Sequence, residues 1–135
     1  MQGYLLDTNV VSASRKREPA VMNWLAAQTG AEHWLSVITI GEIERGIFLK
    51  KRKDPVNAGH LAAWLERLRK TYVGRMIDVN ERISLEWGRI GAIRTRGDAD
   101  GLIAATAFVH GLTLVTRNVS DFADTGVRIV NPWDL

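Results

Sequence analysis

Three acidic residues stand where apolar runs give way to polar ones, which is where α/β proteins often place functional groups. Asp7 directly follows the apolar run 4–6, Glu42 lies three residues after Thr39, and Asp100 lies at the start of a later helical pattern. Carboxylate oxygens are hard ligands that suit Mg²⁺ or Mn²⁺. Because converging carboxylates repel one another, a cation is the natural way to keep them together. The joint placement of these acids therefore predicts a metal site.

Each acid also has an ordinary structural explanation, and the sequence alone leaves both readings open. Asp7 suits the N-cap of a helix. Thr39-Ile-Gly-Glu42 matches a capping box, in which Glu42 bonds back to the Thr39 amide. Asp100 would be stabilised in the first turn of its helix by the helix dipole. Asp98 is predicted to cap that helix, which would leave Asp100 free for chemistry.

A further polar group follows the buried run 112–116, where Asn118 and Asp121 occupy the next loop. Asn in such a loop is most often a turn residue. The chain has no glycine-rich phosphate loop and no Gly-x-Ser-x-Gly motif. The histidines form no metal-ligand spacing and are expected at the surface or at helix ends: His33, His60 and His110.

Alternating strands and helices are predicted to position these groups. We expect strands at 4–6, 33–37, 76–78, 112–116 and 127–130, and helices at 9–14, 19–30, 39–53, 55–74, 80–96 and 98–110. Such alternation predicts a three-layer α/β/α domain around a mainly parallel sheet, with ligands at the carboxyl ends of the strands. The two helices between 39 and 74 are expected to form an antiparallel arm.

Length and composition fit one globular domain. The chain has 135 residues, of which 46 % are hydrophobic and 24 % charged, and it has no cysteine. No apolar run approaches the roughly 20 residues that span a bilayer, and the N-terminus lacks the pattern of a secretory signal. We therefore expect a cytoplasmic protein without a disulfide framework, a thiolate nucleophile or a Cys-ligated zinc.

A net charge of +3 and a pI near 9.6 favour anionic partners. Several basic clusters raise the expectation of nucleic-acid binding, although each also fits a solvated helix end. They comprise Arg15 to Arg17, Lys50 to Lys53, Arg67 to Lys70, and the pair Arg94 and Arg96.

An ordered set of motifs resembles the PIN-domain ribonucleases, and among them the VapC-type toxins of toxin–antitoxin pairs. The motifs are Leu5-Leu-Asp7-Thr-Asn9, the segment from Leu35 to Gly46, the segment from Asp100 to Ala107, and Leu114-Val-Thr-Arg-Asn118 with Asp121-Phe122. The closing Asn131-Pro-Trp133 is similar to the FitB-like branch. Each motif is modest alone, but their order along nearly the whole chain is specific.

The resemblance implies a single PIN domain over 1–135 that cleaves RNA internally, leaves 5′-phosphate ends and acts as a toxin. It implies catalytic roles for Asp7, Glu42, Asp100 and Asn118, with Asp7 and Asp100 holding one Mg²⁺, or Mn²⁺ in its place. The family commonly has a fourth acid where this chain has Asn118, and Asp121 is a candidate substitute. Implied partners are the RNA substrate, a cognate VapB-type antitoxin and a second copy of the chain in a homodimer or a higher assembly with antitoxin, without a membrane.

Two rival interpretations stand beside the nuclease. A signalling receiver domain is another parallel α/β fold with an acidic Mg²⁺ site, but it needs an acidic pair after the first strand and a late lysine. Asp7-Thr-Asn9 offers no such pair, and no lysine follows Lys70. The second rival is a catalytically inactive PIN domain that binds RNA or a partner, and the uncharged Asn118 supports it.

Overall fold

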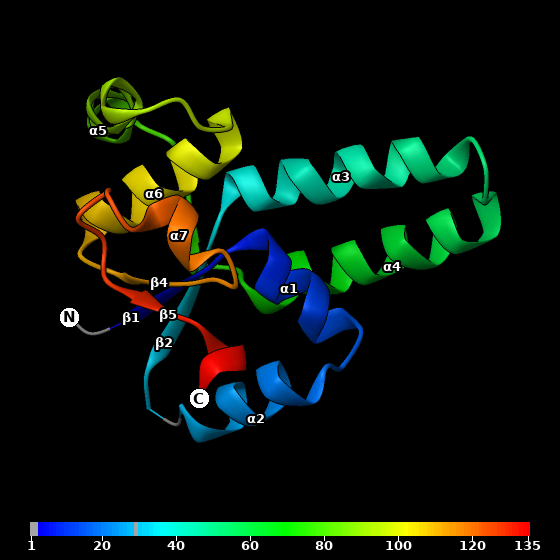
Figure 1. Ribbon diagram of the computed structural model, residues 1–135. Helices are drawn as coiled ribbons and strands as arrows, with labels where there is room; N and C mark the ends of the chain where they lie inside the picture. Colours follow the sequence, from blue (N-terminus) through cyan, green and yellow to red (C-terminus); the bar gives the residue numbers. More distant parts are fainter. Residues whose placement is uncertain (1–2, 29) are drawn as a thin grey trace.

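A wholly parallel five-stranded sheet runs through the middle of the protein in the computed structural model, which describes residues 3–28 and 30–135 (Figure 1). The strand order is β3-β2-β1-β4-β5. The strands are β1 Gly3–Leu6, β2 Glu32–Ser36, β3 Met76–Ile77, β4 Thr113–Val115 and β5 Ile129–Val130.

Helices cover both faces of the sheet, which confirms the predicted three-layer α/β/α architecture (Figure 1). They are α1 Thr8–Arg15, α2 Pro19–Ala27, α3 Val37–Lys51, α4 Pro55–Thr71, α5 Glu81–Ile93, α6 Asp98–His110, α7 Val119–Phe122 and the short 3₁₀ helix η1 Pro132–Asp134. None of the helices within residues 3–28 and 30–135 is long and apolar enough to cross a membrane.

The central strands are buried on both sides, and neighbouring residues of β1 feed two separate hydrophobic clusters. Leu6 packs with α1, α2 and the base of the arm, whereas Leu5 packs with α5, α6 and α7. β4 repeats the pattern with Val115 and Leu114. Each buried leucine contributes roughly 1.5–3 kcal/mol. Strands packed on both faces hold the loops at their carboxyl ends in fixed positions.

Helices α3 and α4 form the predicted antiparallel arm, which projects away from the sheet (Figure 1). Asp54 begins α4 by accepting a hydrogen bond from the Asn57 amide at 3.2 Å, and Pro55 occupies the first turn. Ile43, Ile47 and Leu65 join the arm to the main hydrophobic cluster, so its base is fixed while its tip is exposed.

Several predicted boundaries are wrong at their ends. Helix α3 begins at Val37, not Thr39, because the Ser36 hydroxyl accepts a hydrogen bond from the Ile38 amide at 3.0 Å and caps the helix. Helix α2 ends at Ala27 and α5 at Ile93, both earlier than predicted. The predictions placed no element over α7 or η1.

Two side chains also differ from their predicted settings. Its helical spacing with Ile83 and Ile90 predicts that Trp87 faces inward, but its side chain is 39 % exposed. Its ring lies so close to Gly101 that a Cβ there would be 2.9 Å from Trp87 Cδ1, which explains the glycine. His33, predicted at the surface or a helix end, instead lies in β2 beside the rings of Tyr4 and Trp24. Burial and, secondarily, the charge of Arg75 lower its pKa.

Candidate active site

The sheet topology brings the loops after β1 and β4 together. These strands are neighbours, but the chain leaves β1 for β2 on one side and returns to β4 on the other. At such a point the connections diverge and leave a crevice at the carboxyl ends. Here the Asp7 amide donates to the Val115 carbonyl at 2.9 Å, and the Thr116 hydroxyl donates to Asp7 Oδ2 at 2.8 Å.

The structure confirms Asp7 as the N-cap of α1 and places its carboxylate in a buried setting. Its Oδ1 accepts from the Thr8 amide at 2.8 Å, and its Oδ2 accepts from Thr116 and, at 3.2 Å, from Asn9 Nδ2. The residue is only 2 % exposed. Burial raises the pKa of Asp7 to about 6, the hydrogen bonds from Thr116 and Thr8 oppose the rise, and the nearby charges of Asp100 and Glu42 add to it.

The Thr116 hydroxyl is the hub of this network. Besides donating to Asp7, it accepts from the Asn118 amide at 3.0 Å and from Asn9 Nδ2 at 3.3 Å. Asn9 Oδ1 in turn accepts from the Arg117 amide at 3.3 Å. One buried hydroxyl therefore fixes the Asp7 carboxylate relative to the loop after β4.

The capping-box hypothesis for Glu42 is wrong. Thr39 lies inside α3 and is buried, because Ser36 is the cap. Glu42 Oε1 instead accepts from the Thr8 hydroxyl at 2.6 Å, and that hydroxyl lies 3.0 Å from the Thr39 hydroxyl. Glu42 is therefore held toward the end of β1, where Asp7 lies.

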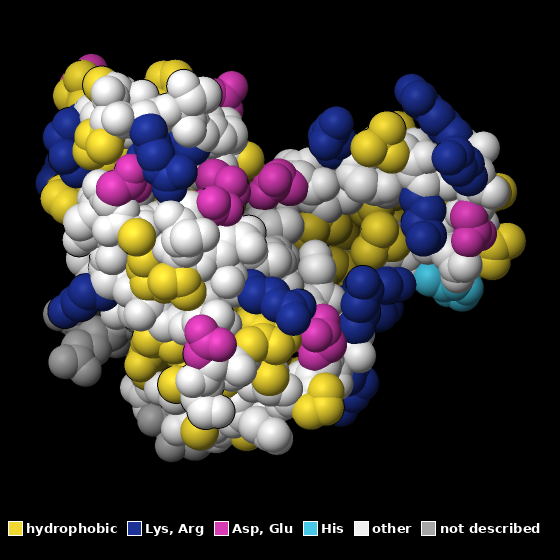
Figure 2. Space-filling model, viewed as in Figure 1, with side chains coloured by type: hydrophobic (Ala, Val, Ile, Leu, Met, Phe, Trp, Pro, Cys, Tyr) yellow, Lys and Arg dark blue, Asp and Glu magenta, His cyan; other side chains and the backbone are white. Residues whose placement is uncertain are grey.

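Asp100 occupies the first turn of α6, as predicted, and is partly buried. The expectation that Asp98 caps the helix is wrong, because Gly97 is the N-cap residue and no side chain caps it. Burial raises the pKa of Asp100, and the charges of Glu42 and Asp121 raise it further, while Arg96 opposes them. Figure 2 shows acidic side chains gathered over the first turns of α3 and α6.

Asn118 lies directly before α7, and Asp121 lies within that helix. Asn118 is the N-cap residue of α7, and its exposed side chain makes no capping hydrogen bond. Asp121 is exposed and contributes negative charge to the surroundings of Asp100. The structure thus brings all four predicted catalytic residues to one edge of the sheet.

Arg94 and Arg96 hold α7 in place through Asp124, an arrangement we refer to as the arginine clamp. Arg94 Nε lies 2.7 Å from Asp124 Oδ2, and Arg96 Nη2 lies 3.1 Å from Asp124 Oδ1. Both guanidinium groups also donate to the Asp121 carbonyl. From the sequence, these arginines were expected either to be solvated or to bind phosphate. It carried no signal for Asp124, whose partners lie 28 and 30 residues away.

The donor set fits a hard divalent cation. In the described part of the chain, no three Asp, Glu or His side chains are gathered closely enough to enclose a metal ion by themselves. Mg²⁺ needs no such cage, because it is usually held by one or two carboxylates with water and substrate phosphates. Asp7 Oδ1 accepts a single hydrogen bond and keeps a lone pair for a cation. A bound cation would also relieve the repulsion among these acids.

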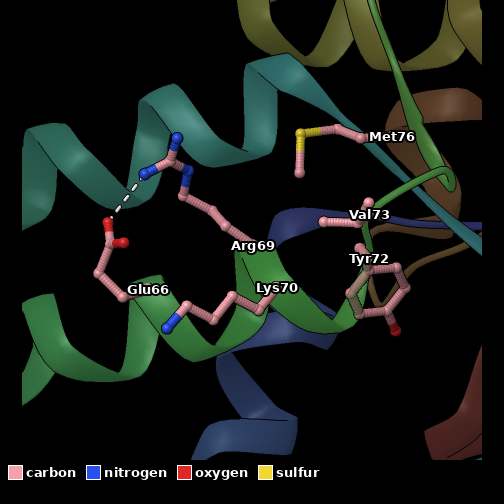
Figure 3. A pocket seen from close by; sticks show the side chains of 6 residues that line it. All are labelled: Glu66, Arg69, Lys70, Tyr72, Val73 and Met76. Atoms are coloured by element: carbon pink, nitrogen blue, oxygen red, sulfur yellow. Dashed lines mark hydrogen bonds and ion pairs between the residues drawn. The ribbon is translucent and has the colours of Figure 1, made fainter.

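A separate cavity of about 350 Å³ lies at the foot of the arm, near the amino end of β3 (Figure 3). Its lining contains none of the four candidate catalytic residues and consists of Glu66, Arg69, Lys70, Tyr72, Val73 and Met76. Arg69 is already paired with Glu66 at 2.8 Å. The predicted basic cluster 67–70 is thus placed away from the acidic edge.

The chain belongs to the PIN-domain family, which it matches over residues 4–127. It is 34 % identical over 140 residues to the toxin FitB of Neisseria gonorrhoeae, covering 96 % of this chain and 97 % of that protein. It is 32 % identical over 139 residues to the VapC ribonuclease Y4jK of Sinorhizobium fredii, covering 96 % and 97 %. The crystal structure of FitAcB from N. gonorrhoeae superimposes with a TM-score of 0.87 at 31 % identity, covering 98 % of this chain and 99 % of that one.

Proposed function

We propose that this chain is a single-domain, metal-dependent endoribonuclease toxin that hydrolyses RNA phosphodiester bonds and is neutralised by a cognate VapB-type antitoxin. The observation that carries the proposal is the convergence of Asp7, Glu42 and Asp100 at the carboxyl edge of a PIN-domain sheet. Its relatives include proteins named as a toxin and as a ribonuclease.

Asp7 and Asp100 hold one Mg²⁺, or Mn²⁺ in its place. When bound, the cation polarises the scissile phosphate and lowers the pKa of a water molecule. The hydrogen bonds from Thr116, Thr8 and Asn9 orient the Asp7 carboxylate. Glu42, held by the Thr8 hydroxyl, orients the attacking water for in-line displacement.

Asn118 replaces the fourth acid that the family commonly has at this position. Its side chain presents an amide oxygen and amide hydrogens without charge. It can orient a water or a phosphate oxygen, but it adds no negative charge to hold a second cation. We therefore propose one bound metal, with Asp121 supplying the nearest additional negative charge to Asp100.

The partners follow from the toxin role. A toxin that cleaves the RNA of its own cell must be blocked by an inhibitor, which is the function of the cognate antitoxin. The proposed assembly is a homodimer bound by antitoxin. Apolar residues exposed on the arm, including Phe48 and Leu49, are candidates for these contacts.

The test is cleavage of structured RNA by purified, antitoxin-free protein. We expect cleavage with Mg²⁺ or Mn²⁺, loss of cleavage in EDTA, and a loss of at least about a thousandfold in Asp7→Asn and Asp100→Asn. Asp98→Asn is the matched control, because Asp98 is an exposed acid in the same helical turn as Asp100 and caps nothing. Folded protein that left RNA intact with every divalent metal would instead support the RNA- or partner-binding module.

A further inference from the structure

Arg117 is attached to the catalytic network through its backbone. It follows Thr116 directly, and its amide donates to Asn9 Oδ1 at 3.3 Å, while Asn9 Nδ2 reaches Asp7 Oδ2 at 3.2 Å. The residue itself is exposed. The hydrogen bond to Asn9 therefore fixes the Arg117 backbone beside the site, while its side chain is exposed to solvent.

Trp133 provides a flat platform for the Arg117 guanidinium, whose central carbon lies 4.8 Å from the centre of the indole ring. The two residues come from adjacent strand ends, since β4 pairs with β5 through Val115 and Val130. A guanidinium stacked on an aromatic face keeps the N–H groups at its edges available.

The platform itself is held in place. The Trp133 amide donates to Asn131 Oδ1 at 3.0 Å, and the indole N–H donates to Glu18 Oε1 at 3.4 Å. The ring also packs against the hydrophobic cluster that contains Leu6. The proposed nuclease mechanism assigns no role to η1, the 3₁₀ helix that contains Trp133.

Apart from its contact with the Trp133 ring, the charge of Arg117 has no partner in the described part of the chain. Across residues 3–28 and 30–135, its guanidinium forms no ion pair and no hydrogen bond, whereas Arg94 and Arg96 are paired with Asp124. The neighbouring edge carries four acids that repel a polyanion: Asp7, Glu42, Asp100 and Asp121. Beside the proposed metal, a fixed cation next to this edge offers the RNA backbone a favourable electrostatic contact.

We infer that Arg117, stacked on Trp133, binds a backbone phosphate of the RNA substrate, with Trp133 as the positioning residue. The inference rests on the proposed function and gives that site a substrate contact. The planar guanidinium donates two parallel hydrogen bonds to phosphate oxygens, a geometry that a lysine ammonium cannot reproduce. Such a contact raises affinity without selecting a base.

RNA binding measures this contact without cleavage when Asp7→Asn is the background. We expect Arg117→Gln to weaken binding of single-stranded RNA roughly tenfold and to reduce the slope of log Kd against log salt concentration by about 0.7. Arg128→Gln is the matched control. It removes the same charge from an exposed arginine at the amino end of β5, where Arg128 donates to the Gly111 carbonyl.

Three further measurements separate binding from folding. With otherwise unmodified protein, Arg117→Gln should raise KM more than it lowers kcat and leave the melting temperature unchanged. Arg117→Lys should restore the salt slope but only part of the affinity, because it keeps the charge and loses the planar fork. Trp133→Phe should bind RNA better than Trp133→Leu, since it keeps an aromatic platform.

The outcomes distinguish this inference from the proposed nuclease. If the protein cleaves RNA and Arg117→Gln matches Arg128→Gln in affinity, salt slope and KM, the phosphate contact is wrong and the nuclease stands. If the protein does not cleave but Arg117→Gln lowers affinity and slope, the contact stands and the nuclease proposal fails.

Discussion

The two halves of the site are built in different ways. Asp7 lies at the ends of β1 and β4, buried, with three hydrogen bonds on its carboxylate from residues directly beyond those strands. Asp100 lies at a helix start, partly exposed, beside a short helix that the arginine clamp holds from outside. The strand ends position Asp7 through backbone pairing, whereas the Asp100 half depends on ion pairs.

This difference predicts separate weaknesses. In the Asp7 half, burial of the ionised Asp7 carboxylate lowers the free energy of unfolding, so stability should depend on pH. In the Asp100 half, stability should depend on Arg94, Arg96 and Asp124, which are not among the four candidate catalytic residues. Changes of pH and single substitutions in each half should therefore lower the free energy of unfolding by different amounts.

The largest effect is expected from the pH dependence of Asp7. Folding raises its pKa from 3.8 to about 6, so between these values the native state binds more protons than the unfolded chain. The free energy of unfolding in EDTA should therefore fall as pH rises from about 4 to 6, by up to about 3 kcal/mol. Asp7→Asn keeps a good N-cap and should remove this decrease. Urea unfolding across this range measures it, and parallel profiles for the two proteins would contradict the prediction.

Arg96→Gln should destabilise the protein by about 2 kcal/mol, since it removes charged hydrogen bonds. The Arg96 side chain is only 6 % exposed and lies against Asp124. Arg89→Gln is the control, because Arg89 pairs with Glu86 within α5 but is half exposed; its loss should destabilise the protein less than the loss of Arg96. Equal costs in chemical denaturation would show that the arginine clamp does not secure α7.

Thr116→Val should cost about 1 kcal/mol and lower cleavage roughly ten- to a hundredfold, because the Asp7 carboxylate loses a donor and its orientation. Thr116→Ser should retain both properties. Thr106→Val is the control, since Thr106 is equally buried but donates only to the Leu102 carbonyl within α6. Chemical unfolding and RNA cleavage are measured for each variant. Normal cleavage by Thr116→Val would show that the Thr116 hydroxyl has no role in the reaction.

Glu42→Gln should leave the free energy of unfolding within about 0.5 kcal/mol, because Glu42 is exposed and caps no helix. Cleavage should nevertheless fall roughly a hundredfold if Glu42 orients the attacking water. Glu44→Gln, an exposed acid in the same helix, should cleave normally. A Glu42→Gln protein as active as Glu44→Gln would exclude the proposed role.

Much of the fold was predictable because its signals are local. Apolar runs and glycine ends located the strands and the arm, and α6 was predicted to its exact ends, with Gly111 in the left-handed conformation that closes it. Asp7 was located by the apolar run that ends directly before it, and Asp100 by the helical pattern that begins at Asp98.

The remaining features depend on contacts between distant segments. The residues Thr39 and Glu42 match the local pattern of a capping box, but Ser36 caps α3. The Glu42 carboxylate instead accepts a hydrogen bond from the Thr8 hydroxyl at the start of α1. The arginine clamp joins α5's end to Asp124, and a charge run cannot reveal which of its members are paired. Short elements such as α7 have too few residues to show a period.

The bond between Thr116 and Asp7 spans 109 positions of the chain, which has a consequence for synthesis. A growing chain that has emerged only through α6 already contains Asp7, Glu42 and Asp100, yet it lacks the strand that completes the crevice. Because non-local pairings form slowly, we expect the Asp7 carboxylate to stay unfixed while the nascent polypeptide lacks β4. The crevice can therefore be completed only after residue 116 has been synthesised, close to the end of translation.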